Sequence, residues 1–80
     1  MTRHSPRNEL HPITGEITAE TRDAWLLVVD MFSNPIRKAW LPKSCCEISN
    51  DSIVGYSRKA TISIPAWLIE KQQLENYVDD

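Results

Sequence analysis

The sequence contains few of the residues around which catalytic and cofactor sites are built. Its only glycines, at positions 15 and 55, are too far apart for a phosphate-binding loop. The two histidines, His4 and His11, lack the paired His and Cys-x2-Cys spacings of zinc sites. The acidic residues show no pairing typical of hydrolases. The sequence therefore predicts a protein that is not an enzyme and that holds no metal or cofactor.

Long apolar runs are also absent. No stretch approaches the roughly 18–20 apolar residues that a membrane span requires, and residues 1–6 are polar where a secretion signal would be apolar. The only cysteines, Cys45 and Cys46, are adjacent, and neighbouring cysteines can close a disulfide only through a strained ring. We therefore expect two free thiols, a cytoplasmic location and no membrane partner.

The length and composition predict one folded domain preceded by an arm. With 80 residues, 41% hydrophobic and 25% charged, the chain resembles an ordinary small globular domain. Residues 1–20 contain two prolines, a glycine, both histidines and few large apolar side chains. We expect this segment to be a flexible arm, with docking on the domain or on a partner through Leu10, Ile13 and Ile17 as an option, and residues 21–80 to form the compact domain.

The pattern of apolar residues predicts antiparallel strands followed by a helix. Residues 24–32 are apolar on both faces, as in a central strand or the wall of a small barrel, although a buried helix has a similar pattern. Residues 33–35 have turn chemistry, and residues 36–41 are the expected return strand. Residues 43–48 continue it as a bent strand, and residues 49–52 form a turn. Residues 60–64 alternate as a half-buried strand.

Pro65 is placed to begin a C-terminal helix, because proline at the first helical position loses no needed hydrogen bond. That helix is expected to end near Lys71, with a further turn over residues 74–78. The predicted fold class is therefore α+β: three or four antiparallel strands, with curling into a barrel as one option, and a helix covering one open side.

Positive charge is concentrated in the middle of the chain. The net charge is -2, but residues 35–64 carry five Lys/Arg against two Asp/Glu. The candidate binding residues are Arg37, Lys38, Trp40, Lys43, Arg58 and Lys59. A shared basic face with Trp40 as a stacking platform would suit a single-stranded nucleic acid. The alternative is a solvated rim that protects strand edges, with Trp40 in the core.

Two short motifs resemble a group of phage proteins. Residues 39–44 read Ala-Trp-Leu-Pro-Lys-Ser and residues 64–68 read Ile-Pro-Ala-Trp-Leu. Over roughly residues 24–74 the chain resembles small uncharacterised phage and prophage proteins in which a hairpin ends in Trp-Leu-Pro-Lys-Ser and a helix begins with Pro-x-Trp-Leu. The resemblance implies an accessory protein of a mobile element in the host cytoplasm, a class that includes inhibitors of host defence such as anti-CRISPR proteins. It implies no catalytic residues.

These observations favour a non-enzymatic factor that binds a host or phage protein. An unpaired edge strand or an exposed tryptophan is the expected contact surface. The alternative is a small nucleic-acid-binding module that uses the basic central residues. The sequence does not determine the oligomeric state.

Overall fold

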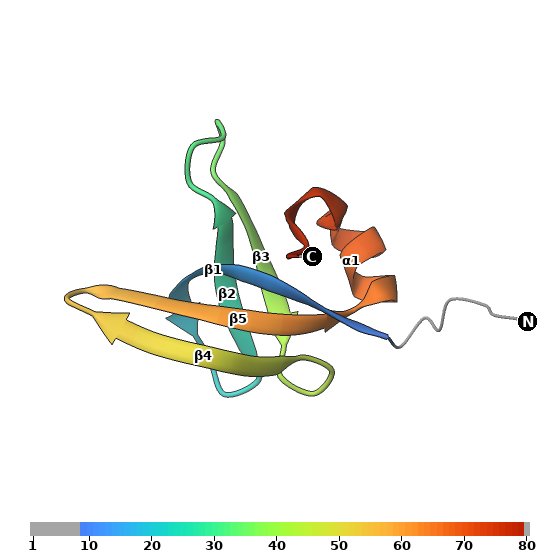
Figure 1. Ribbon diagram of the computed structural model, residues 1–80, viewed down its shortest axis with the longest axis horizontal. Coiled ribbons are helices and arrows are strands. Elements are labelled where there is room, and N and C mark those ends of the chain that lie inside the picture. Colours follow the sequence, from blue (N-terminus) through green and yellow to red (C-terminus); the bar gives the residue numbers. More distant parts are fainter. Residues whose placement is uncertain (1–8, 80) are drawn as a thin grey trace, which may run out of the picture.

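A computed structural model describes residues 9–79, which form a five-stranded antiparallel sheet and one short helix (Figure 1). The elements are β1 (Leu10–Glu20), β2 (Ala24–Asp30), β3 (Arg37–Pro42), β4 (Glu47–Val54), β5 (Ser57–Pro65), α1 (Ala66–Gln72) and the 3-10 helix η1 (Glu75–Tyr77). The strand order is β3-β2-β1-β5-β4, with β3 and β4 at the edges. The α+β class is confirmed. Three or four strands were too few, and the sheet of the described residues is open rather than a barrel.

Strand β1 is shared between two hairpins. Its first part, from Leu10 to Glu16, pairs with β5, and its last part, from Glu16 to Glu20, pairs with β2. Figure 1 shows the consequence: the β2–β3 and β4–β5 hairpins run in nearly perpendicular directions, and β1 passes from one to the other. The two hairpin turns therefore point in different directions, the β2–β3 turn to the top of Figure 1 and the β4–β5 turn to the left.

The central position of β1 corrects the expectation of a flexible arm over residues 1–20. Residues 10–20 are ordered strand in the middle of the sheet, while residues 1–8 lie outside the described part of the chain. The misleading residue is Pro12, because proline cannot donate to a strand ladder and is rare in central strands. The backbone oxygen of Pro12 accepts a bond from the Asp79 amide at 2.8 Å. Because N–H and C=O of a strand residue point to the same side, the proline nitrogen also faces the C-terminal segment, and the β5 ladder loses nothing.

The β2–β3 hairpin confirms the predicted pair of strands around residues 33–35. β2 alternates across both faces and pairs with β1 and β3, so residues 24–30 form a strand inside the sheet and not a helix. The turn contains a cis Asn34–Pro35 peptide bond. Pro42 is the last residue of β3, and the chain then turns over residues 43–45, where a bent strand was expected.

The predicted turn at residues 49–52 is wrong. These residues lie inside β4, where the pairing with β5 shifts register between Ser49 and Ser52. Asn50 takes a left-handed conformation with φ of 52°, which asparagine tolerates better than most residues. Turn-forming residues therefore accommodate a bulge here, and the chain reverses later, at Gly55, with φ of 63°.

One face of the sheet is covered by α1 and the segment after it. The fully buried side chains are Ile13, Leu27, Leu41, Ile62, Ile64 and Leu74. The predicted helix is present but begins one residue later than expected, at Ala66, with Pro65 as its N-cap; it ends at Gln72, and the C-cap residue Gln73 is left-handed with φ of 58°. The Leu74 amide then donates to the Ile69 carbonyl at 2.9 Å, which closes the helix end and turns Leu74 into the core.

Candidate binding surfaces

The structure divides the six candidate residues between two faces of the sheet. Lys38 lies opposite Val28, Val28 opposite Glu16, and Glu16 opposite Lys59. Residues opposite one another in neighbouring strands project from the same face, so this row crosses four strands on the face away from α1. Trp40, two residues after Lys38, shares that face and is 46% exposed. Trp40 is therefore a surface residue and not part of the core.

Arg37 lies on the opposite face and binds the end of α1. Its guanidinium donates to the backbone oxygens of Gln72 and Gln73, the latter at 2.8 Å. These carbonyls at the helix C-terminus lack partners within the helix and carry the negative end of its dipole. Arg37 thus fastens the β2–β3 hairpin to the helix, which is a structural role that the sequence pattern did not reveal.

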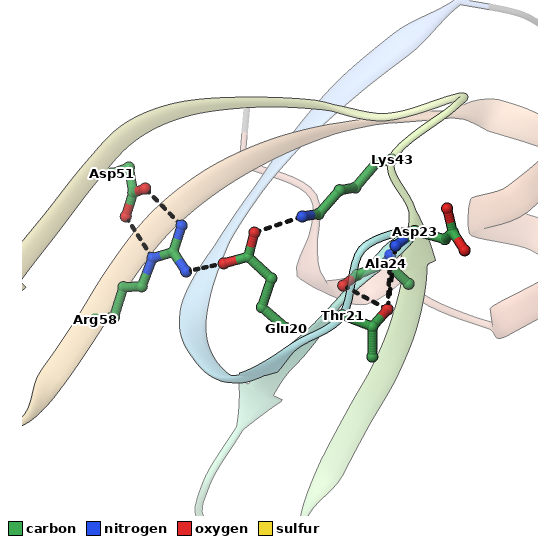
Figure 2. Close-up of polar contacts among 7 residues, drawn as sticks. All are labelled: Glu20, Thr21, Asp23, Ala24, Lys43, Asp51 and Arg58. Carbon is green, nitrogen blue, oxygen red and sulfur yellow. Dashed lines mark hydrogen bonds and ion pairs between the residues drawn. The ribbon is translucent and has the colours of Figure 1, made fainter.

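Lys43 and Arg58 are joined through one carboxylate (Figure 2). Glu20, at the end of β1, accepts a bond from the Lys43 ammonium and another from the Arg58 guanidinium. Arg58 also pairs with Asp51 of β4, at 2.9 Å from Nε and 2.7 Å from the second terminal nitrogen. This ion-pair cluster, Lys43–Glu20–Arg58–Asp51, connects the β1–β2 turn, the β3–β4 connection and both strands of the β4–β5 hairpin.

The hydrogen bonds of this cluster shift the titration of its members. The Lys43 and Arg58 bonds hold the pKa of Glu20 below its ordinary value, and the Arg58 bond lowers the pKa of Asp51. The two carboxylates raise the pKa of Arg58. Lys43 also lies 5.3 Å from the centre of the buried Trp25 ring. Lys43 and Arg58 are therefore charge-paired within the fold, and the six candidates do not form one basic face.

Large apolar side chains are exposed at both hairpin turns. The β2–β3 tip, residues 31–36, exposes Met31, Phe32 and Ile36, and Phe32 is 97% exposed. The β4–β5 tip, residues 53–56, exposes Ile53, Val54 and Tyr56. Phe32 is therefore not part of the expected strand over residues 24–32, which ends at Asp30. The signal against placing Phe32 in that strand was the turn chemistry of residues 33–35, because a side chain next to a turn projects beyond the sheet.

A cleft of about 290 Å³ lies beside the β2–β3 tip, where β1 leaves β2. Its lining includes Val28, Met31 and Phe32 from the hairpin, and Glu16 and Lys59 from the outer row. The backbones approach closely here: a Cβ added to the neighbouring Gly15 would lie 2.4 Å from the Val28 oxygen. The cleft thus places apolar and charged groups side by side at the base of the tip.

The two cysteines lie just before β4 and are free thiols, as predicted. Their sulfur atoms are 3.9 Å apart, and the Cys45 thiol also contacts the Pro42 backbone oxygen at 3.7 Å. Cys45 is half-buried and Cys46 is buried in the core. Burial, with a smaller contribution from Cys45, raises the pKa of the Cys46 thiol to about 12.

The histidines, which were considered as zinc ligands from the sequence, belong to no metal site within the described residues. His4 lies outside the described residues, and no group of three or more His, Cys, Asp or Glu side chains within residues 9–79 is arranged to hold a metal ion. None of the helices in this part of the chain has the length and apolar character needed to cross a membrane. In comparisons with known proteins, no family model, curated protein or solved structure matches this chain.

Proposed function

We propose that this protein is a non-enzymatic protein-binding factor that makes contact through its two hairpin tips. The observation that supports the proposal is the exposure of Met31, Phe32 and Ile36 at one tip and of Ile53, Val54 and Tyr56 at the other. Exposed apolar groups that gather at one place on a small protein mark interaction sites more often than single scattered ones do. Aromatic side chains also dominate the energetics of protein interfaces.

The position of these side chains strengthens the proposal. A two-stranded hairpin has little stability of its own, and the tips extend beyond the part of the sheet that α1 covers (Figure 1). Burial of the tips against a partner would remove their apolar surface from water. The cleft at the β2–β3 tip adds Glu16 and Lys59, which provide polar contacts at its base.

The more specific part of the proposal is that the partner is a host or phage protein, and that the chain is a mobile-element accessory factor, such as an anti-CRISPR-like inhibitor of host defence. This part rests on the resemblance of residues 39–44 and 64–68 to phage proteins. A non-enzymatic inhibitor needs only a binding surface, and the exposed apolar side chains of the tips are the candidates for it.

Affinity capture with matched variants tests the proposal. Phe32→Ser and Tyr56→Ser each remove one exposed aromatic group, and Lys71→Ser changes an exposed residue of α1 as the control. Capture from a lysate, with and without nuclease, should recover a protein that is retained by the control and lost at least tenfold with either tip variant. Recovery that is equal for all four proteins, or that disappears with nuclease, would contradict binding through the tips.

The second candidate function is nucleic-acid binding, which is favoured by the shared outer face of Lys38, Trp40 and Lys59. Each phosphate that a lysine neutralises should contribute about -0.7 to the slope of log affinity against log salt for single strands. Lys38→Ala should therefore flatten the slope measured by fluorescence anisotropy. Lys43→Ala should leave the slope unchanged, because Lys43 is paired with Glu20. Absence of binding at low salt would exclude this function.

A further inference from the structure

The Cys45–Cys46 pair combines two properties that matter for the binding of a reagent: the sulfur atoms lie close together, and they differ in access to solvent. The sulfur atoms are held 3.9 Å apart, so both can reach one small atom. They differ in access, since Cys45 is half-buried and Cys46 is buried. A reagent would therefore meet Cys45 first, and the second bond to Cys46 would then be intramolecular.

A direct disulfide between the two residues is opposed by geometry. Adjacent Cα atoms are about 3.8 Å apart across a trans peptide, whereas disulfides join Cα atoms roughly 4.4–6.8 Å apart. An atom inserted between the sulfurs relaxes this constraint. Bonds of about 2.3 Å from such an atom to each sulfur, the length typical of zinc–sulfur bonds, meet at roughly 100° at a pyramidal centre and so join sulfurs about 3.5 Å apart. The observed separation of 3.9 Å exceeds that span by only about 0.4 Å, which a small rotation of the two side chains closes.

We propose that Cys45 and Cys46 form a chelating site for trivalent arsenic compounds. An organoarsenic(III) oxide condenses with two thiols: both S–H bonds and the As–O bonds break, two As–S bonds form, and one water leaves. Arsenic stays trivalent and no oxidant is needed. The product is neutral, which suits the apolar surroundings of Cys46.

Divalent metal ions fit this site less well than arsenic(III) does. They bind thiolates, so two negative charges would have to form beside the core, where burial raises the pKa of Cys46 to about 12. They also require further ligands, and none of the described His, Cys, Asp or Glu side chains completes a group of three. The arsenical needs two protonated thiols and nothing else, which is what the pair offers.

Phenylarsine oxide is the probe for the test, with intact-mass spectrometry as the readout. The folded wild-type protein should gain one arsenical per chain. The adduct should survive a large excess of 2-mercaptoethanol and be removed by 2,3-dimercaptopropanol, because only a dithiol matches the chelate. Cys45→Ser and Cys46→Ser should each lose the monothiol-resistant adduct. An equally resistant adduct in either variant would overturn the proposal.

A second measurement covers the case in which replacement of the buried Cys46 unfolds the domain. Wild-type protein is treated with the arsenical, then with iodoacetamide, and its peptides are mapped. Protection of both thiols from alkylation supports chelation. Protection of Cys45 alone, or an adduct that forms only when the protein is unfolded in urea, shows that the folded pair does not chelate.

Discussion

Strands β2 and β4 are of similar length but are stabilised in different ways. β2 has neighbours on both sides and buries Trp25, Leu27 and Val28, whereas β4 is an edge strand with no fully buried residue. β2 is therefore held mainly by side-chain burial. β4 is held mainly by its backbone pairing with β5 and by the contact between Asp51 and Arg58, with one partly buried side chain, Ile48, packed against the core. The fold thus contains a region specified by packing and a region left free to present side chains.

Truncation of a buried side chain in β2 should have the largest effect. Leu27 is 0% exposed and packs in the core, so Leu27→Ala should lower the free energy of unfolding by about 2–5 kcal/mol. Ile53→Ala in β4, where the side chain is 71% exposed, should change it by no more than about 0.5 kcal/mol. Urea denaturation followed by tryptophan fluorescence measures both. Similar losses in the free energy of unfolding of the two variants would show that β2 does not depend on side-chain burial more than β4 does.

The next largest effect is expected at the close contact between β1 and β2. The methyl group of Gly15→Ala would lie 2.4 Å from the Val28 backbone oxygen, so the two strands must separate locally. We expect a loss of about 1–3 kcal/mol in the free energy of unfolding.

Gly55, at the β4–β5 tip, provides the matched control. A Cβ added there meets no atom within 4 Å, and only its φ of 63° opposes substitution. Gly55→Asn should therefore be nearly neutral, since asparagine tolerates a left-handed conformation. If Gly15→Ala proves as mild as Gly55→Asn in urea denaturation, the close approach of the strands does not limit stability.

The smallest effect is expected for the ion-pair cluster that joins the β1–β2 turn and the β3–β4 connection to the β4–β5 hairpin. Glu20→Gln removes the carboxylate bound by Lys43 and Arg58, but these side chains remain 27–37% exposed, and ion pairs in contact with water contribute little. Stability should fall slightly, and added salt should narrow the difference from the wild type. Glu47→Gln, an exposed carboxylate of β4, should leave stability unchanged.

The same cluster predicts the direction of the pH dependence. The folded pKa of Glu20 lies below its ordinary value of 4.5, so between the two values the unfolded chain binds more protons. The contribution of the Glu20 ion pairs to stability is therefore complete above about pH 4.5. It is lost as the pH falls through the folded pKa of Glu20. Asp51 contributes in the same way: its folded pKa lies below its ordinary value of 3.8, so its contribution to stability is lost as the pH falls below about 3.8. Thermal melts from pH 6 downward should show a steeper loss for the wild type than for Glu20→Gln, and parallel curves would contradict the assignment.

The sequence could predict the elements whose signals are local. The hairpin around residues 33–35 and the helix after Pro65 are each encoded by a few adjacent residues. Strand β1 could not be recognised in this way, because the segments that satisfy its backbone are β2, β5 and the residues around Val78, all distant in sequence. The bulge in β4 was mistaken for a turn because the same residue types, Asn and Ser, serve both.

The candidate site was predictable to a similar extent. The sequence identified Trp40, Lys38 and Lys59, which do share a face, but it grouped them with Arg37, Lys43 and Arg58. Successive side chains of one strand point to opposite faces, but which residues of different strands share a face is known only once the pairing register is known. The partners of Arg37 and Arg58 lie in other elements, so nothing local marks them as structural.

The division of β1 between two hairpins also determines how the chain can fold during synthesis. The pairing of β1 with β2, and of β2 with β3, uses residues that leave the ribosome early, but the pairing of Leu10 with Pro65 must wait until residue 65 has been made. Until then the apolar face around Ile13 has no cover, because Ile62, Ile64 and Leu74 are all still to come. The growing chain therefore passes through a stage in which the β2–β3 hairpin has formed but the first part of β1 has no strand to pair with. The apolar side chains of that part are then exposed and prone to aggregate.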